Sequence, residues 1–200
     1  RILYIFLGIC VLSMFVGYAS NPGQILALLL SIPGVLIAIT FHEYAHAWAA
    51  YKLGDDTAKS QGRLSLNPLK HMDPIGIVML LFLGFGWGRP VEIDSRNFNR
   101  NISVRKAEAI VSIAGPLANF ILAIVFSAIY GALIKFNALT SMDTRTALTI
   151  ITILQSIISI NIGLGVFNLI PLPPLDGSKV LSYFLPYNAR TVSYTHLRAH

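Results

Sequence analysis

Four long apolar segments constrain the fold of this chain more than any other feature of its sequence: residues 2–19, 24–51, 107–134 and 147–170. A helix needs about 20 mostly apolar residues to cross the hydrocarbon of a bilayer. Charged residues make up only 12% of the chain, against roughly 25% in soluble domains. We therefore predict an all-α integral membrane protein with about four transmembrane helices.

The loop between the second and third segments indicates the orientation in the membrane. Nine lysine or arginine residues and five acidic residues lie between positions 52 and 106. Basic loops face the cytoplasm, so we expect this loop there. It forms no basic stripe and no binding motif, so no nucleic-acid partner is expected. Within it, residues 75–87 are apolar over only 13 positions, which predicts a re-entrant or interfacial segment rather than a crossing.

Three ionisable residues interrupt the second apolar segment. His42, Glu43 and His46 form the pattern HExxH within residues 35–54, which are otherwise mostly apolar. Residues four apart share one face of a helix, so both imidazoles can reach one zinc ion, and Glu43 beside them can accept a proton. Ionisable groups inside a bilayer are costly and are usually retained for function. The pattern predicts one zinc ion per chain, with Glu43 as the catalytic residue.

A third protein ligand is expected, because catalytic zinc sites ordinarily have three. Asp176 is the first candidate, since it follows the fourth apolar segment and a proline run that cannot continue the helix. The predicted crossings bring it to the cytoplasmic side, where the HExxH helix also ends. The alternative is an ordinary turn aspartate that caps the next helix. His71 is the rival ligand, although a surface histidine is the simpler interpretation of its polar surroundings.

Two asparagines lie within apolar sequence, Asn119 in AGPLANF and Asn168 in FNLIP. A buried amide needs hydrogen-bond partners, and bonds between helices are one way to supply them. In the functional interpretation, the two side chains hold the substrate backbone or the oxyanion near the zinc ion.

Together, the motifs HEYAH, GPLAN and NLIPLPPLDG resemble those of site-2 proteases, the intramembrane zinc metalloproteases of peptidase family M50. The resemblance covers most of residues 25–185 and points to the compact branch of the family, which has little beyond the membrane core. Matching positions imply that His42, His46 and Asp176 bind zinc and that Glu43 is catalytic. They also imply that Asn119 and Asn168 serve the site.

The resemblance further implies a membrane-associated strand or re-entrant region after the first motif. We place it in residues 57–70 and 75–88, which adds a re-entrant or short β-containing segment to the predicted fold. Residues 1–190 are expected to form a single membrane-embedded core. Residues 191–200 lose the apolar pattern, and we interpret them as a truncated or foreign tail.

The expected function is hydrolysis of a peptide bond in or near the transmembrane segment of a membrane protein. The substrate would unwind locally and pair with an edge strand near residues 57–70. The expected partners are this substrate and the lipid bilayer, in a prokaryotic plasma membrane with the site toward the cytoplasm; the oligomeric state stays open. One alternative is a metal-cation transporter, which needs polar residues along several helices. The other is a catalytically silent zinc-binding protein, which would not need Glu43.

Overall fold

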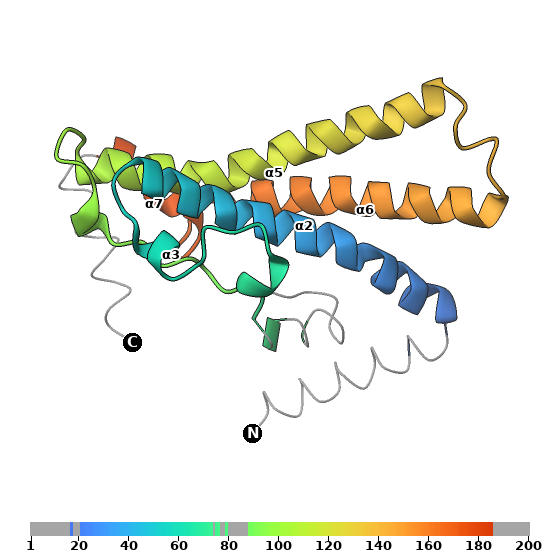
Figure 1. Cartoon of the computed structure of the whole chain (residues 1–200), viewed down its shortest axis with the longest axis horizontal. Coiled ribbons are helices and arrows are strands. Elements are labelled where there is room, and N and C mark those ends of the chain that lie inside the picture. The colour runs from blue at the N-terminus through green and yellow to red at the C-terminus, as the bar shows by residue number, and fades with distance from the viewer. Residues whose placement is uncertain (1–16, 18–20, 74, 77–78, 80–87, 186–200) are drawn as a thin grey trace. The chain divides into compact units, whose positions relative to one another are not determined.

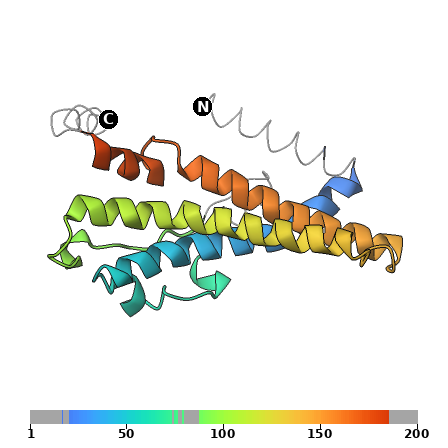
Figure 2. The ribbon, with the colours of Figure 1, turned by 90° about the horizontal axis from the view of Figure 1, so that it is seen from above.

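The computed structural model describes residues 17, 21–73, 75–76, 79 and 88–185. Its elements are α2 (Pro22–Lys52), α3 (Thr57–Ser60), the 3₁₀ helices η1 (Pro68–Lys70) and η2 (Ser95–Asn97), α5 (Val104–Lys135), α6 (Thr144–Asn168) and α7 (Asp176–Phe184) (Figure 1 and Figure 2). Among the described residues there is no strand, and the isolated antiparallel bridge between Met72 and Gly88 is the β pairing found. The described part of the chain is therefore mainly helical, as predicted.

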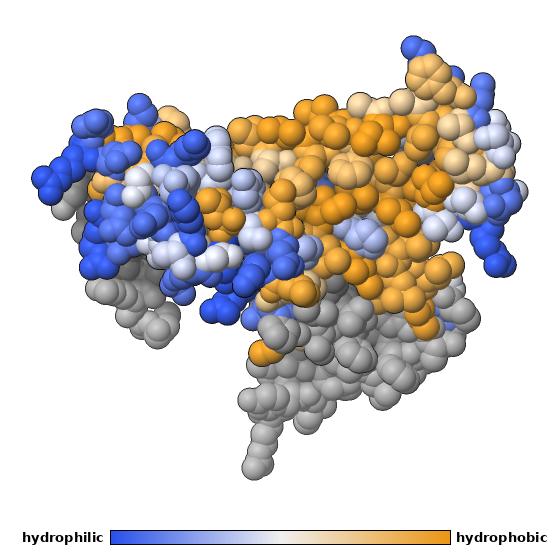
Figure 3. All heavy atoms as spheres, in the orientation of Figure 1, coloured by the Kyte–Doolittle hydropathy of each residue, from blue (hydrophilic) through white to orange (hydrophobic). Residues whose placement is uncertain are grey.

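Three of these helices are long and apolar enough to cross a membrane: Ile25–Lys52, Val104–Lys135 and Thr144–Asn168. They match the second, third and fourth predicted spans. Large apolar side chains on them are exposed, including Ile124 at 69% and Leu148 at 58%. Figure 3 shows apolar side chains covering α5 and α6, and hydrophilic side chains around α3. Apolar surface of this kind is covered by lipid in a membrane.

The first predicted span, residues 2–19, lies outside the described residues except for Gly17. Most of the predicted re-entrant segment, residues 75–87, also lies outside them, as does the tail 191–200. The count of four spans therefore stays a prediction.

The edge strand predicted in residues 57–70 is not confirmed, because this stretch holds α3 at its start, η1 at its end and irregular backbone between them. Asp55 Oδ1 accepts the backbone N–H of Thr57 at 3.1 Å, and Asn67 Oδ1 accepts that of Leu69 at 3.1 Å. Aspartate and asparagine side chains that bond to the backbone two residues ahead favour turns and helix starts over strands. Pro68 supports the start of η1, since its fixed φ suits the first residue of a helix.

Contacts between residues divide the chain into two compact units. One contains Arg1–Thr40, Leu66–Pro90 and Ile121–Asn161, and the other contains Phe41–Ser65, Val91–Phe120 and Ile162–His200. In the first unit, α2 and α6 come close at Gly34, where a β-carbon would lie 3.1 Å from the backbone nitrogen of Ile157 and 3.1 Å from Ser156 Oγ. Small residues allow membrane helices to approach in this way.

In the second unit, the end of α2 packs against the start of α5. A buried apolar cluster joins them, made of Ala49, Ala50, Ala107, Val111 and Phe98. The alanines let the helices approach closely, and burying a side chain of the size of phenylalanine stabilises a fold by about 1.5–3 kcal/mol. Because Ala49 and Ala50 lie one helical turn after His46, the cluster holds α5 beside the predicted zinc motif.

The short helix α7 is held at both ends within the same unit. At its C-terminal end, Arg105 Nη2 donates hydrogen bonds to the carbonyls of Tyr183 at 2.8 Å and Leu185 at 3.3 Å. Figure 2 shows α7 alongside the first part of α5, from which Arg105 comes. At its N-terminal end, a β-carbon on Gly177 would lie 2.7 Å from the carbonyl oxygen of Ile170. These contacts fix Asp176, the first residue of α7.

Candidate metal centre

Three side chains of the second unit that could hold a metal ion converge on one point. His42 and His46 come from α2 and Asp176 from α7, and each offers one ligand atom within 4.8 Å of the others. The two Nε2 atoms are 3.0 Å apart, and Asp176 Oδ2 lies 3.3 Å from His42 Nε2 and 3.1 Å from His46 Nε2. His42 is 5% exposed and His46 is 7% exposed, so the cluster is shielded from solvent.

Hydrogen bonds behind the two rings determine which nitrogen faces the centre. His46 Nδ1 donates to the carbonyl of Val111 at 2.7 Å, and a carbonyl can only accept. His42 Nδ1 donates to Asn119 Oδ1 at 2.6 Å, and Asn119 is fully buried. In a neutral imidazole the other nitrogen then carries a lone pair. Both Nε2 atoms are therefore ready to bind a cation.

The donor set fits a zinc ion. Asp176 Oδ2 is buried and accepts no hydrogen bond, so three lone-pair atoms face one another with no proton between them. Such atoms repel unless a cation lies among them. Two imidazole nitrogens and one carboxylate oxygen are a common set for catalytic zinc. Tetrahedral zinc with bonds of about 2.0–2.1 Å places its ligands about 3.3 Å apart, close to the separations found here.

Gly115 of α5 lies directly against the two rings. A β-carbon at this position would lie 2.6 Å from His46 Cε1 and 2.7 Å from His42 Cε1. Any side chain would displace the imidazoles. Gly115 and Asn119 are four residues apart, so both lie on the face of α5 that meets α2. This gives the GPLAN motif a physical role, since its glycine makes room for the rings and its asparagine orients one of them.

Glu43 is half-buried, next to the histidines in sequence. Its Oε2 accepts the backbone N–H of Val91 at 2.8 Å. Val91 belongs to the irregular segment between Pro90 and η2. The contact fixes one carboxylate oxygen of Glu43 and leaves Oε1 as the second acceptor of an ionised group.

The other predicted residues lie elsewhere. Asn168 Nδ2 donates to the carbonyl of Leu164 in its own helix at 3.0 Å, so its oxyanion role stays a prediction. The same role stays a prediction for Asn119, whose contact with His42 is a different one. His71 is fully buried, which makes the interpretation of a surface histidine wrong. It is not part of the metal-binding group found among the described residues.

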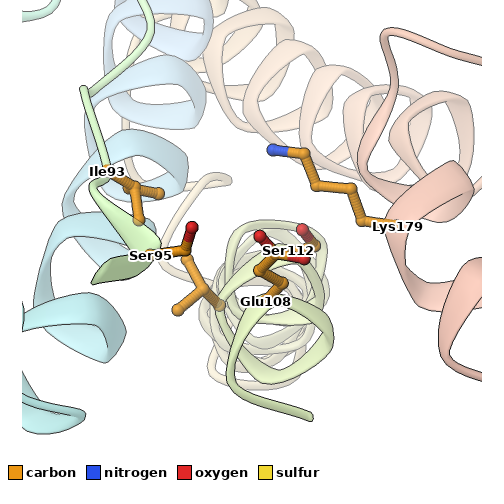
Figure 4. Close-up of a pocket in the computed structure, with 6 residues that line it drawn as sticks. Ile93, Ser95, Glu108, Ser112 and Lys179 are labelled. Atoms are coloured by element: carbon orange, nitrogen blue, oxygen red, sulfur yellow. The ribbon is translucent and has the colours of Figure 1, made fainter. Parts of the chain in front are cut away.

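A small cavity lies between the elements that build the centre. Its volume is about 70 Å³, and it is lined by Ile93, Ser95, Glu108, Val111, Ser112 and Lys179. Figure 4 shows Glu108 and Ser112 on one side and Lys179 reaching in from α7. About 10–15 Å³ of such accessible space is enough for one water, so the cavity has room for at least one. Val111, whose carbonyl accepts the hydrogen bond from His46, is one of the residues that line it.

Reasoning from the sequence missed Gly115, Val91 and Val111 as residues that support the site. Val91 and Val111 act through backbone atoms, which every residue has, so no side-chain pattern marks them. Gly115 did leave a signal, because its spacing of four from Asn119 puts both on one face of a helix.

Comparisons with known proteins identify the family of this chain. The model of the family described as Peptidase family M50 matches residues 30–197. A Bacillus subtilis protein described as a candidate zinc metalloprotease, YwhC, is 42% identical over 162 residues, which cover 78% of this chain and 69% of that protein. A candidate zinc metalloprotease of Mycolicibacterium smegmatis, Rip2, is 30% identical over 76% of this chain and 56% of its own length.

The Rip2 protein of Mycobacterium tuberculosis is 29% identical over 75% of this chain and 55% of its own length. The chain thus spans little more than half of the mycobacterial relatives. No solved structure matches it. The family match covers most of the chain and includes the residues that converge in the metal centre, so the chain belongs to peptidase family M50, the site-2 protease family of membrane metalloproteases.

Proposed function

We propose that this protein is an intramembrane protease that hydrolyses a peptide bond in or near the transmembrane segment of a membrane protein. The observation that carries this proposal is the convergence of His42, His46 and Asp176 beside Glu43, at the end of a helix long enough to cross a membrane. Three ligands leave a fourth position for water or substrate, as catalytic zinc sites require.

His42, His46 and Asp176 would hold one zinc ion. When bound, zinc lowers the pKa of a coordinated water and polarises a carbonyl group. Glu43 accepts a proton from the attacking water and passes it to the nitrogen of the leaving amine. Val91 restrains Glu43 through its N–H, and Asn119 and Val111 keep the Nε2 atoms turned inward.

We also propose that the site opens toward the cytoplasm of a prokaryotic cell. The basic loop between α2 and α5 supports this orientation, because basic loops stay on the cytoplasmic side. The relatives named above come from bacteria. Water has to reach the site from that side, since the hydrocarbon holds none. The cavity to which Glu108, Ser112 and Lys179 contribute polar side chains is a suitable stopping point for it.

The decisive experiment compares the wild type with Glu43→Gln. Both proteins are purified, loaded with zinc and reconstituted into liposomes with tagged single-span membrane proteins of the host. Substrates are first chosen by proteomics, as membrane proteins whose fragments appear in cells with the wild-type protein and not in cells with the Gln variant. The amide of the Gln variant keeps an oxygen for the N–H of Val91, so geometry and zinc content should be retained while cleavage stops. Normal cleavage by the Gln variant would overturn the mechanism.

The same liposomes separate the proposal from the transporter alternative. A protease gives product without net movement of zinc across the bilayer. Zinc flux in the wild type that continues in Glu43→Gln, with no product in either protein, would favour transport instead. Zinc binding with neither flux nor cleavage would favour the silent binding protein.

A further inference from the structure

Asp55 is a fully buried carboxylate just beyond the end of α2, on the second unit. Its Oδ1 accepts hydrogen bonds from the N–H and the hydroxyl of Thr57, and from Asn97 Nδ2 at 3.0 Å. Its Oδ2 accepts the backbone N–H of Asp94 at 2.8 Å. A buried carboxylate is stable in a protein when its oxygens are bonded in this way.

The two oxygens hold different parts of the chain. Oδ1 bonds mainly to the local turn that starts α3, through Thr57. Oδ2 bonds to Asp94, the residue just before η2, and Oδ1 also accepts from Asn97, the last residue of η2. Asp55 therefore ties residues 91–97 to the end of α2.

The other end of the same segment contacts the candidate base. Val91, three residues before Asp94, donates its N–H to Glu43 Oε2 at 2.8 Å. Asp94 has extended backbone angles, with φ −105° and ψ 103°. Three extended residues span about 10 Å, so an anchor at Asp94 strongly limits where the N–H of Val91 can lie.

Further contacts keep this segment on α2 without Asp55. The N–H of Asn99 donates to the carbonyl of Leu53 at 2.8 Å, and Phe98 lies in the buried cluster with Ala49 and Ala50. Gly54 has a φ of +106° and packs directly against Asn99. A change that affects only Oδ2 of Asp55 should therefore shift the segment rather than unfold it.

We propose that Asp55 is a positioning residue for Glu43. Through the hydrogen bond to Asp94 it sets the segment that begins at Val91, and the N–H of Val91 in turn holds the carboxylate of Glu43 in its reactive orientation. This inference rests on the proposed function, because the orientation of Glu43 matters only if Glu43 is the base. It assigns no contact with substrate or metal to Asp55.

The first test replaces Asp55 with asparagine. An amide has one acceptor oxygen and one donor nitrogen, so the new side chain can keep the bonds of Oδ1 but turns an N–H₂ toward the N–H of Asp94. Displacing a catalytic group by about 1 Å can slow a reaction by up to about 100-fold. We expect kcat of Asp55→Asn to fall about tenfold or more, with KM and zinc content near those of the wild type. Asp56→Asn is the matched control, since it removes a neighbouring exposed carboxylate.

The second test uses Val91→Pro, which removes the N–H that bonds to Glu43. This variant should itself lower kcat with zinc retained. In the double variant Asp55→Asn/Val91→Pro, the second change should add little, because both act through the same N–H. If the losses in kcat of the two single variants multiply in the double variant, Asp55 does not act through the N–H of Val91 and the inference is overturned. An unchanged kcat in Val91→Pro or in Asp55→Asn would also overturn it. If zinc-loaded wild type cleaves nothing, the proposed function fails first and the inference falls with it.

Discussion

Gly115 of α5 lies so close to His46 of α2 that no methyl group fits between them. The closeness follows from the α2–α5 contact, in which alanines on both helices let the backbones approach. The metal centre therefore depends on a residue that supplies no ligand atom. Gly115 is needed because it has no side chain that would displace the two imidazole rings.

We expect Gly115→Ala to weaken zinc binding about 10- to 100-fold, because overpacking typically costs about 1–3 kcal/mol and the rings must move to relieve it. Zinc content after dialysis against a graded chelator measures the loss. Gly163→Ala is the matched control, since no atom lies within 4 Å of a β-carbon there. Equal zinc affinity in the Gly115 and Gly163 variants would contradict the geometry.

Asn119 provides a second prediction, about the orientation of His42. Asn119→Leu removes the acceptor for His42 Nδ1 at similar volume, and loss of such a partner usually lowers metal affinity about 10- to 100-fold. Asn119→Asp should bind zinc better than Asn119→Leu, because carboxylates commonly accept this hydrogen bond. Competition with a fluorescent zinc chelator gives the affinities. The opposite order of the two variants would refute the assigned role.

Asn168 serves as the comparison, because its amide bonds within α6. Asn168→Ala should leave zinc affinity unchanged. A fall in kcat at unchanged zinc affinity would support the oxyanion role predicted for this residue. An unchanged kcat would show that Asn168 does not have this role.

The sequence was sufficient for the parts of this protein that depend on side-chain type and helical spacing. The spacing of four between His42 and His46 places both on one helical face, and α2 does present both to one point. Asp176 could be placed with them because a proline run ends the preceding helix on the same predicted side. Hydrophobic length located α2, α5 and α6 within a few residues.

The features that the sequence did not predict depend on side chains that bond to nearby backbone, on backbone atoms and on tertiary packing. Residues 57–70 were assigned a strand or re-entrant region by resemblance, yet Asp55 and Asn67 bond to the backbone ahead of them and form turns. The roles of Val91 and Val111 come from an N–H and a carbonyl, so they appear only when the segments meet in space. His71 looked exposed because its sequence neighbours are polar, whereas its burial is decided by tertiary packing.

Arg105 gives a prediction about the far end of α7. Its guanidinium donates to the carbonyls of Tyr183 and Leu185, at the C-terminal end of the helix. Arg105→Ala should loosen α7 and lower zinc affinity by about tenfold, because the two exposed hydrogen bonds that it removes contribute about 0.5–1.5 kcal/mol each. Lys106→Ala, which removes the same charge from the next position, is the control. Hydrogen exchange of residues 181–185 should increase in the Arg105 variant alone.

The last prediction concerns the dependence of stability on pH. Burial raises the pKa of Asp55, but the hydrogen bonds from Thr57, Asn97 and Asp94 outweigh it and lower the pKa below its ordinary value. The unfolded chain has a pKa of about 3.9 at this position. A group with a lowered folded pKa contributes stability above the unfolded value and loses it as the pH falls through the folded value. The stabilising effect of Asp55 should therefore be complete above about pH 5 and decline below it.

Urea unfolding in detergent, with the zinc removed from all samples, measures this effect as the difference in free energy of unfolding between the wild type and Asp55→Asn. The difference should stay constant from about pH 7 to pH 5 and shrink below about pH 4. The reason is chemical: a protonated carboxyl group, like an amide, keeps one oxygen as a free acceptor and presents a hydrogen on the other side, so it also loses the bond from the N–H of Asp94. The two proteins thus become alike in acid. If the difference in free energy of unfolding grew as the pH fell, Asp55 would be protonated in the folded protein. The hydrogen bonds assigned to its two oxygens would then be wrong.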